Sequence, residues 1–520
     1  MLVVRRYLWG AVAAAVLLGS ASAGLAQTCS LELKRPDISN SNGEGAFFLE
    51  TSRNSNFAPR GQLIRVGNGD RSGEFSDLIS KELDEYQSEY PVRGILALGS
   101  NRFGFVVDSS LVNESEVKGD DDGVRVQIVD PFAMQQSPEE RAASQVVYDL
   151  LYLDRNQNGN LTDDEVVKLD PADITFAPYP KTSFLIVDVP LTIDSIVCDY
   201  SFTLEIMTYG SDMRAGTVRG AAYREGEITI EGVLTGPLVR NGSEALLTSK
   251  GENHRIVLVD HNNNGRFDDK LAIPEHVRLS SDTIYLSQGD RLYIDPDMSN
   301  QSRDSYSPAM DDDYFDVSDL IAIDGQLYDL AISPSGDELS LEPSDVTVGY
   351  VSNPNPNYRA LAYGEQGFMK LIGDESGKTP LPVGEWKLYG YKIDLTDIVA
   401  ELEEENSSIV GMLSRTLGPK STPPGGPGTI VTATATRDYK AVEVVEGETV
   451  EMPFGAPYRP VVSVGYAQGD GRYSLGLSLV GAADEVCESM YVNGAQPGKP
   501  KFTITTDDGE IVEEGQFDYG

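Results

Sequence analysis

Short alternating segments, separated by turn residues, are the feature that most limits what this chain can fold into. They are rich in β-branched and aromatic residues, they are bounded by Gly, Asp, Asn or Ser, and typical examples are 202–206, 227–231, 255–259 and 283–286. Two hairpins are also legible, with strands at 327–332 and 338–341 and at 502–505 and 510–512. Signals for helices are few, and the best candidates are 137–141 and 393–417. We therefore expect a mainly β protein of several antiparallel, β-sandwich-like units with few short helices.

The length of 520 residues is enough for several folded units. A run of Pro and Gly at 421–428 has the composition of a linker, and the hairpin that ends at Leu341 suggests a softer boundary. Within the unit between them, residues 381–391 resemble a strand of sandwich modules of the prealbumin or carboxypeptidase-regulatory type, although any antiparallel strand after a turn has this pattern. The predicted organisation is a signal peptide (1–26), one or more β-rich domains (27–343), a sandwich-like unit with a helical segment (344–420), the linker (421–428) and a C-terminal β unit (429–520).

The N-terminus has the pattern of an export signal. Arg5 and Arg6 precede an apolar run at 8–18, and small residues follow up to Ala23 or Ala26, after either of which cleavage is expected. No later stretch is long enough to predict a transmembrane span. We therefore expect a protein that is secreted or held in the periplasm or cell envelope.

The net charge limits the classes of binding partner, and the cysteine content limits the possible disulfides. The formal net charge is −41, so the chain repels phosphate backbones and nucleic acid is a poor candidate partner. The three cysteines, Cys29, Cys198 and Cys487, allow one disulfide in an oxidising compartment. We favour a pair between Cys29 and Cys198 because both lie in the same part of the chain.

The segment 154–165, DRNQNGNLTDDE, carries the clearest chemical pattern. It resembles the calcium loop of EF-hand proteins, with Asp or Asn at positions one, three and five, Gly at six, an apolar residue at eight and Glu at twelve. The resemblance implies Ca²⁺ as the ligand, and a solvated acidic turn is the alternative. The flanks permit either two helices or a strand followed by a helix. The implied ligands are Asp154, Asn156, Asn158, the backbone carbonyl of Asn160 and the carboxylate of Glu165.

The segment 260–271, DHNNNGRFDDKL, repeats the first half of that pattern. Leu271 stands where the closing acid belongs, so this loop is similar to shortened DxDxDG variants that close through Asp268 or Asp269. An alternating segment at 255–259 predicts a strand before it. We expect His261 to face solvent. The implied ligands are Asp260, Asn262, Asn264, Arg266 at position seven and Asp269.

Patterns of catalytic residues are scarce. The three histidines lie in one segment without an HExxH motif, and the chain has neither a G-x-S-x-G motif nor a glycine-rich phosphate loop before a helix. We therefore assign no catalytic residue and expect a secreted calcium-binding protein that acts as a binding or structural module at the cell exterior, with an extracellular protein or glycan as its partner. An extracellular, glycosidase-like hydrolase with structural calcium is the alternative, because a glycosidase needs only a pair of carboxylates.

Overall fold

The structure is a computed structural model. It describes residues 27–35, 62–67, 74–111, 146–170, 174, 181–209, 213–230, 252–274, 284–287, 289–296, 314–323, 326–373, 377–396, 428–466 and 473–518. The predicted signal peptide, the helix candidate at 137–141, most of the candidate at 393–417 and linker residues 421–427 lie outside the described residues.

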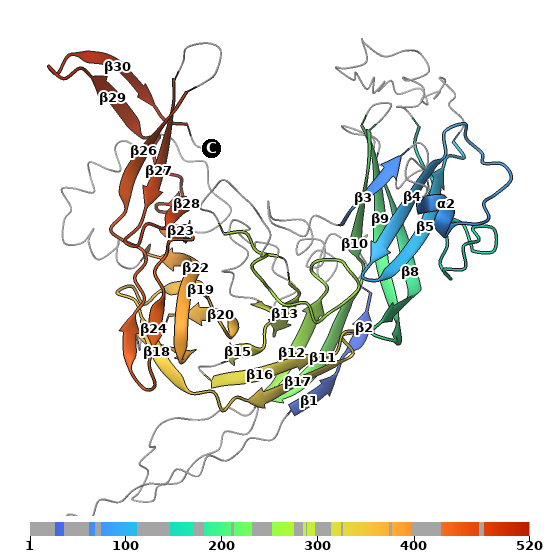
Figure 1. The fold of residues 1–520 in the computed structure, drawn as a ribbon, viewed down its shortest axis with the longest axis horizontal. Coiled ribbons are helices and arrows are strands. Elements are labelled where there is room, and N and C mark those ends of the chain that lie inside the picture. Colours follow the sequence, from blue (N-terminus) through green and yellow to red (C-terminus); the bar gives the residue numbers. More distant parts are fainter. Residues whose placement is uncertain are drawn as a thin grey trace, which may run out of the picture.

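Three antiparallel sheets form from residues before position 344 (Figure 1). The eight-stranded sheet has the order β7 (Val167–Lys168), β6 (Leu150–Leu153), β5 (Asn101–Asp108), β4 (Val92–Leu98), β3 (Gln62–Gly67), β10 (Met213–Gly220), β9 (Ile196–Tyr209) and β8 (Lys181–Ile193). The five-stranded sheet has the order β14 (Phe315–Asp316), β13 (Arg291–Ile294), β12 (Glu252–Val259), β11 (Tyr223–Ile230) and β2 (Glu32–Lys34). The four-stranded sheet has the order β1 (Gln27–Ser30), β17 (Glu338–Pro343), β16 (Gln326–Ile332) and β15 (Leu320–Ile323).

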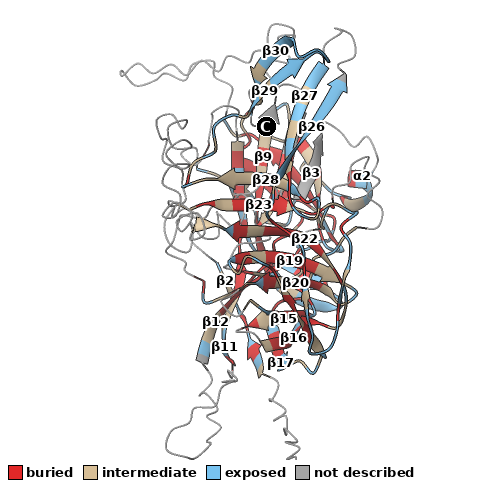
Figure 2. Ribbon diagram, turned by 90° about the vertical axis from the view of Figure 1, so that its left-hand side faces the viewer, coloured by how far each residue is buried: buried red, intermediate tan, exposed pale blue. Residues whose placement is uncertain are grey.

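Three further sheets follow in the remainder of the chain. A second eight-stranded sheet contains β20 (Gly367–Ile372), β19 (Tyr358–Gly364), β22 (Gly384–Asp394), β23 (Ile430–Thr434), β28 (Val486–Tyr491), β27 (Tyr473–Val480) and β26 (Arg459–Tyr466), with β24 (Val442–Val444) also paired to β22. The smaller sheets consist of β21 (Thr379–Pro382), β18 (Val348–Ser352) and β25 (Thr449–Glu451), and of β29 (Lys501–Thr505) and β30 (Ile511–Gln516). Figure 2 shows that β26, β27, β29 and β30 are largely exposed.

The hairpin of β8 and β9 is unusually long, with strands of 13 and 14 residues. Its register shifts between Ile186 and Val189, where Asp188 has a φ of +55°. Strand β10 pairs with β9 only from Phe202 onward, so residues before it pair with β8 alone. We call residues 187–200 the distal hairpin, because they extend past the end of β10.

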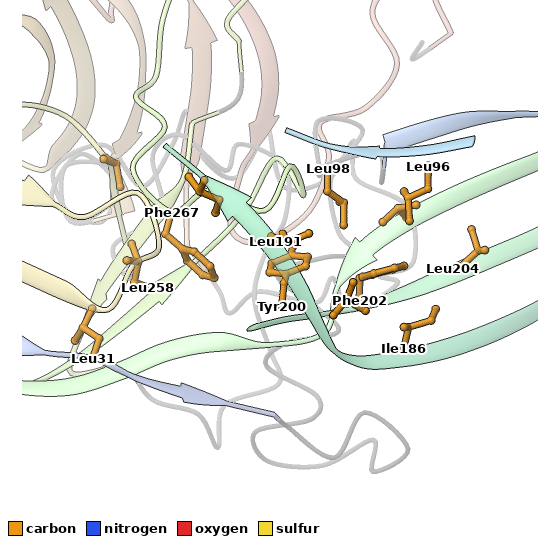
Figure 3. Close-up of a cluster of buried hydrophobic side chains, with 14 of the residues drawn as sticks. Leu31, Leu96, Leu98, Ile186, Leu191, Tyr200, Phe202, Leu204, Leu258 and Phe267 are labelled. Atoms are coloured by element: carbon orange, nitrogen blue, oxygen red, sulfur yellow. The ribbon is translucent and has the colours of Figure 1, made fainter. Parts of the chain in front are cut away.

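The described residues form two large hydrophobic cores and two smaller clusters. The first draws on the three N-terminal sheets, and Figure 3 shows Leu191 and Tyr200 of the distal hairpin packed between Phe267 and Leu258 on one side and Leu98 on the other. The second core contains the buried Trp386 and residues from both sides of the predicted linker. Strands β22 and β23 pair across that linker, so the segments that flank it share one sheet.

The prediction of a mainly β, multi-sheet, sandwich-like protein with few short helices is confirmed; the described helix α2 (Glu74–Leu78) has five residues. The strand predicted at 283–286 is wrong: the described residues 284–286 form no strand, and Ser287 makes one isolated bridge to Ala272. The place beside β12 is taken by β13. The favoured disulfide is also wrong. Cys29 and Cys198 are free thiols that lie in different sheets.

In the part of the chain that the structure describes, no helix has the length and apolar character required to cross a membrane.

Candidate metal sites

The first loop, residues 154–165, follows strand β6 and leads into strand β7. The side chain of Asp154 is fully buried, and its carboxylate accepts the backbone N–H groups of Asn158 (3.0 Å) and Gly159 (2.9 Å). Gly159 has a φ of +76°, and a Cβ atom there would lie 2.9 Å from the carbonyl oxygen of Leu78. Only glycine fits such a position without strain. The buried carboxylate and this glycine therefore fix the turn of the loop.

A neighbouring segment holds the loop from outside. The N–H groups of Ser80 and Lys81 donate to the carbonyl oxygen of Gly159 at 2.9 and 3.1 Å, and the N–H of Leu161 donates to the carbonyl oxygen of Lys81 at 3.0 Å. Leu161 itself is buried beside Phe75 of α2. The apolar residue at position eight thus anchors the loop on the core.

Two aspartates close the first loop. The amide nitrogen of Asn158 donates to Asp163 at 2.9 Å, and the backbone N–H of Arg155 donates to Asp164 at 3.2 Å. Burial raises the pKa of Asp164, and the charges of Asp154 and Asp163 raise it further. Glu165 is exposed, and no hydrogen bond described for these residues joins it to the loop. Its role as a ligand therefore stays a prediction.

The second loop, residues 260–271, repeats the turn of the first. The buried carboxylate of Asp260 accepts the N–H groups of Asn264 (3.2 Å) and Gly265 (2.7 Å). Gly265 has a φ of +90°, and a Cβ atom there would lie 2.5 Å from Leu191 Cδ1. Both loops therefore use their first Asp and their sixth-position Gly in the same way.

Asp269 closes the second loop. Its Oδ2 atom accepts the amide N–H groups of Asn262 (2.9 Å) and Asn264 (2.6 Å). The guanidinium of Arg266 is bound instead by Asp268 and by Asp194 of the distal hairpin, so Arg266 offers the loop only its backbone carbonyl. Asp269 is thus the closing carboxylate that the contacts favour between the two alternatives that the sequence left open.

Sequence reasoning missed two residues that contact the second loop from outside. The hydroxyl of Tyr200 donates to Asp260 at 2.6 Å. The fully buried carboxylate of Asp290 accepts the N–H groups of His261 (3.0 Å) and Asp269 (2.9 Å). Neither residue belongs to the loop motif, and no sequence signal marks them.

Negative charge accumulates in the buried part of the second loop. Burial raises the pKa of Asp260 to about 6. Burial also raises the pKa of Asp290, and the nearby Asp260 and Asp269 add to this rise. Among the described residues, no ion pair neutralises Asp260 or Asp290. A bound cation would supply the missing positive charge.

The donors fit a hard cation. They are carboxylate, amide and carbonyl oxygens, which Ca²⁺ prefers. Within the described residues, no three His, Cys, Asp or Glu side chains form a metal-binding group by themselves. Asn side chains and backbone carbonyls would therefore have to complete either set of ligands.

Two expectations about the surroundings of the loops need correction. His261 is buried, with 3% of its surface exposed, and its backbone N–H donates to Asp290. Burial lowers the pKa of His261, and the nearby charge of Arg291 lowers it further. The first loop connects two strands, since β7 begins two residues after Glu165 and leaves no room for an outgoing helix.

A cavity of about 320 Å³ lies beside β5 and is lined by Ser88, Tyr90 and Ser110 among others. The exposed Glu89 also lines it. Two aspartates reach the lining residues through hydrogen bonds, Asp108 to Ser88 and Asp149 to Ser110. Both aspartates are fully buried. They tie loops to the sheet and offer no free carboxylate pair to a substrate.

Comparisons with known protein families, with curated proteins and with solved structures find no match to this chain.

Proposed function

We propose that this chain is a secreted calcium-binding β protein, with one Ca²⁺ in each loop, that acts as a structural or binding module at the cell exterior. In the first loop the ligands are the side chains of Asp154, Asn156 and Asn158, the carbonyl of Asn160 and a closing carboxylate. That carboxylate is Glu165 from the sequence pattern, or Asp163 or Asp164 from the contacts. In the second loop they are the side chains of Asp260, Asn262, Asn264 and Asp269 and the carbonyl of Arg266.

One observation carries the proposal. Two segments separated by about a hundred residues fold into the same turn, each around a buried Asp that accepts the N–H groups of positions five and six. A solvated acidic turn has no need of a buried carboxylate, whose desolvation is unfavourable. Calcium would offset that cost in both loops.

The expected role of calcium is structural. Leu161 of the first loop packs in a satellite cluster beside the first eight-stranded sheet, and Phe267 of the second loop packs in the first core. An ion that stabilises either loop therefore stabilises the packing of the sheets around it. The hydrolase alternative lacks a comparable observation, because a glycosidase needs two carboxylates, the aspartates beside the cavity are buried, and Glu89 is the one acidic side chain among the described residues that line it.

Isothermal titration calorimetry of residues 27–520 with CaCl₂, after treatment with a chelator, tests the proposal. We expect two sites with dissociation constants of about 10⁻⁴ to 10⁻³ M, the range of extracellular modules, because each loop contributes few ligating charges. Variants Asp154→Asn and Asp260→Asn should each lose one site, and MgCl₂ is the control cation. A flat titration up to 10 mM CaCl₂ would refute calcium binding.

A further inference from the structure

The distal hairpin, residues 187–200, contacts both loops. On the side of the first loop, the amide of Gln157 donates to the carbonyl oxygen of Pro190 at 3.4 Å, and the guanidinium of Arg155 donates to the carbonyl oxygen of Val187. These residues stand at positions two and four, between the ligands Asp154 and Asn158. Any movement of the hairpin would therefore displace residues that stand between two ligands of the first loop.

The contacts with the second loop include a predicted ligand. Tyr200 donates to the first ligand, Asp260, and Leu191 packs against Gly265. Asp194, at the tip of the hairpin, forms an ion pair of 2.8 Å with Arg266. The hairpin therefore contacts positions one, six and seven of the second loop.

The distal hairpin is built as a stiff connection. Its strands pair from Val189 and Tyr200 to the tip, and Leu191 and Tyr200 are fully buried in the first core. Asn101, the first residue of β5, holds the hairpin from the side: it accepts the N–H of Thr192 at 2.9 Å and donates to the carbonyl oxygen of Thr192 at 3.0 Å. A change in the conformation of one loop can therefore reach the other loop through the tightly packed distal hairpin.

We propose that the two calcium sites are coupled through the distal hairpin, so that calcium in one loop raises the affinity of the other. This inference rests on the proposed function. Both loops contact the distal hairpin, so calcium in either loop holds the hairpin in the place that the other loop also requires. The second ion then binds to a loop that already has part of its order, which is the condition for positive cooperativity. Because coupling is reciprocal, each ion must favour the other by the same factor.

The first test compares calcium affinities. The product of the two association constants of the parent is divided by the product of the constants measured for Asp154→Asn, which keeps the second site, and Asp260→Asn, which keeps the first. Coupling predicts a ratio of about ten, within the range of typical allosteric factors. A ratio of one, with both sites still binding, would refute the coupling and leave the proposed function intact. If the parent binds no calcium, the proposed function itself fails.

A second test leaves every predicted ligand in place, so it does not depend on the folding of the ligand variants. The double variant Arg155→Ala/Gln157→Ala removes the contacts between the first loop and the hairpin. It should bind two ions with a Hill coefficient near one, whereas the parent should exceed one. Val197→Ala is the matched control, because Val197 lies on the same hairpin, is 67% exposed and contacts neither loop in the described interactions. Equal Hill coefficients in the parent and the double variant would show that the hairpin does not transmit the effect.

Discussion

Two substitutions can identify the carboxylate that closes the first loop. The carboxylate of Asp164 accepts the backbone N–H of Arg155 at 3.2 Å and is partly buried, which raises its pKa, whereas Glu165 is exposed. We expect Asp164→Asn to weaken calcium binding at this loop by about tenfold, since affinity follows the number of ligating charges, and Glu165→Gln to have a smaller effect. Calorimetric titration of the two variants measures the difference. A larger loss for Glu165→Gln would assign the closing role to position twelve, as the sequence pattern predicts.

Tyr200 provides a test of the second loop that involves no ligand. Its hydroxyl donates to the buried Asp260 at 2.6 Å. Tyr200→Phe removes this donor and leaves the carboxylate with less hydrogen bonding, so we expect the calcium-free protein to lose about 1 to 3 kcal/mol of unfolding free energy. Urea unfolding in the presence of a chelator measures the loss. Tyr285→Phe, at a side chain that is 41% exposed, is the control and should change stability by less than about 0.5 kcal/mol.

The sequence predicted the candidate site residues that belong to a local pattern, and it missed those that do not. Position in the motif is enough to name Asp260 and Gly265, because a loop that winds around an ion has a fixed spacing. Tyr200 is 60 residues before Asp260, and Asp290 is 29 residues after His261. Their contacts depend on which strands become neighbours, and no local spacing encodes that.

The same distinction holds for the strands. The alternating segments correctly predicted β12, β16 and β29, although burial differs among them. Strand β12 is buried on both faces, with Ile256 and Leu258 in the first core and Val257 and Val259 in another cluster, whereas β29 buries none of its residues. Alternation failed at 284–286, where Ile284 is buried but the residues join no strand. The long hairpin of β8 and β9 was not predicted as one element, since the irregularity near Asp188 interrupts its alternation.

The pairing of β22 with β23 predicts the behaviour of the chain after a cut in the linker. These strands pair over five residues on the two sides of 397–427, and Tyr391 and Ala433 belong to the same core. We therefore expect limited proteolysis within 397–427 to give two fragments that remain associated in native size-exclusion chromatography and separate on a denaturing gel. Fragments that elute separately under native conditions would support the independent folding of 429–520 that the sequence suggests.

The hairpin of β26 and β27 carries an apolar face without cover from the described residues. Val462 faces Leu477 and Val464 faces Leu475 on one side of the hairpin, and Val464 is 64% exposed. Val464→Thr should therefore change the unfolding free energy by less than about 0.5 kcal/mol. The matched substitution Val431→Thr, in strand β23, should cost about 1 to 3 kcal/mol because Val431 is buried and the change places a hydroxyl there. Urea unfolding of both variants provides the comparison, and an equal loss in both would mean that Val464 is covered in solution.

At the scale of the whole molecule, the two cores should respond differently to calcium. Phe267 of the second loop packs in the first core, and Leu161 of the first loop packs in the satellite cluster beside it. Trp386 is fully buried in the second core, and the only other tryptophan of the chain is Trp9, in the predicted signal peptide. The fluorescence of residues 27–520 on excitation of tryptophan therefore reports on the second core alone.

We expect calcium at about ten times its dissociation constant to add roughly 1.4 kcal/mol per site to the part of the chain that holds the loops. For a unit of about 300 residues, one such increment raises the melting temperature by about 2 °C. Calorimetry should therefore show a transition that shifts upward with calcium and returns with chelator, while the tryptophan transition stays in place. Leu320 and Leu327 of the four-stranded sheet pack in the second core, whereas their neighbours Ile321 and Tyr328 pack in the first. If these contacts make the two cores unfold as one unit, the tryptophan transition will shift with calcium as far as the calorimetric one, and the division of stability between the cores will be disproved.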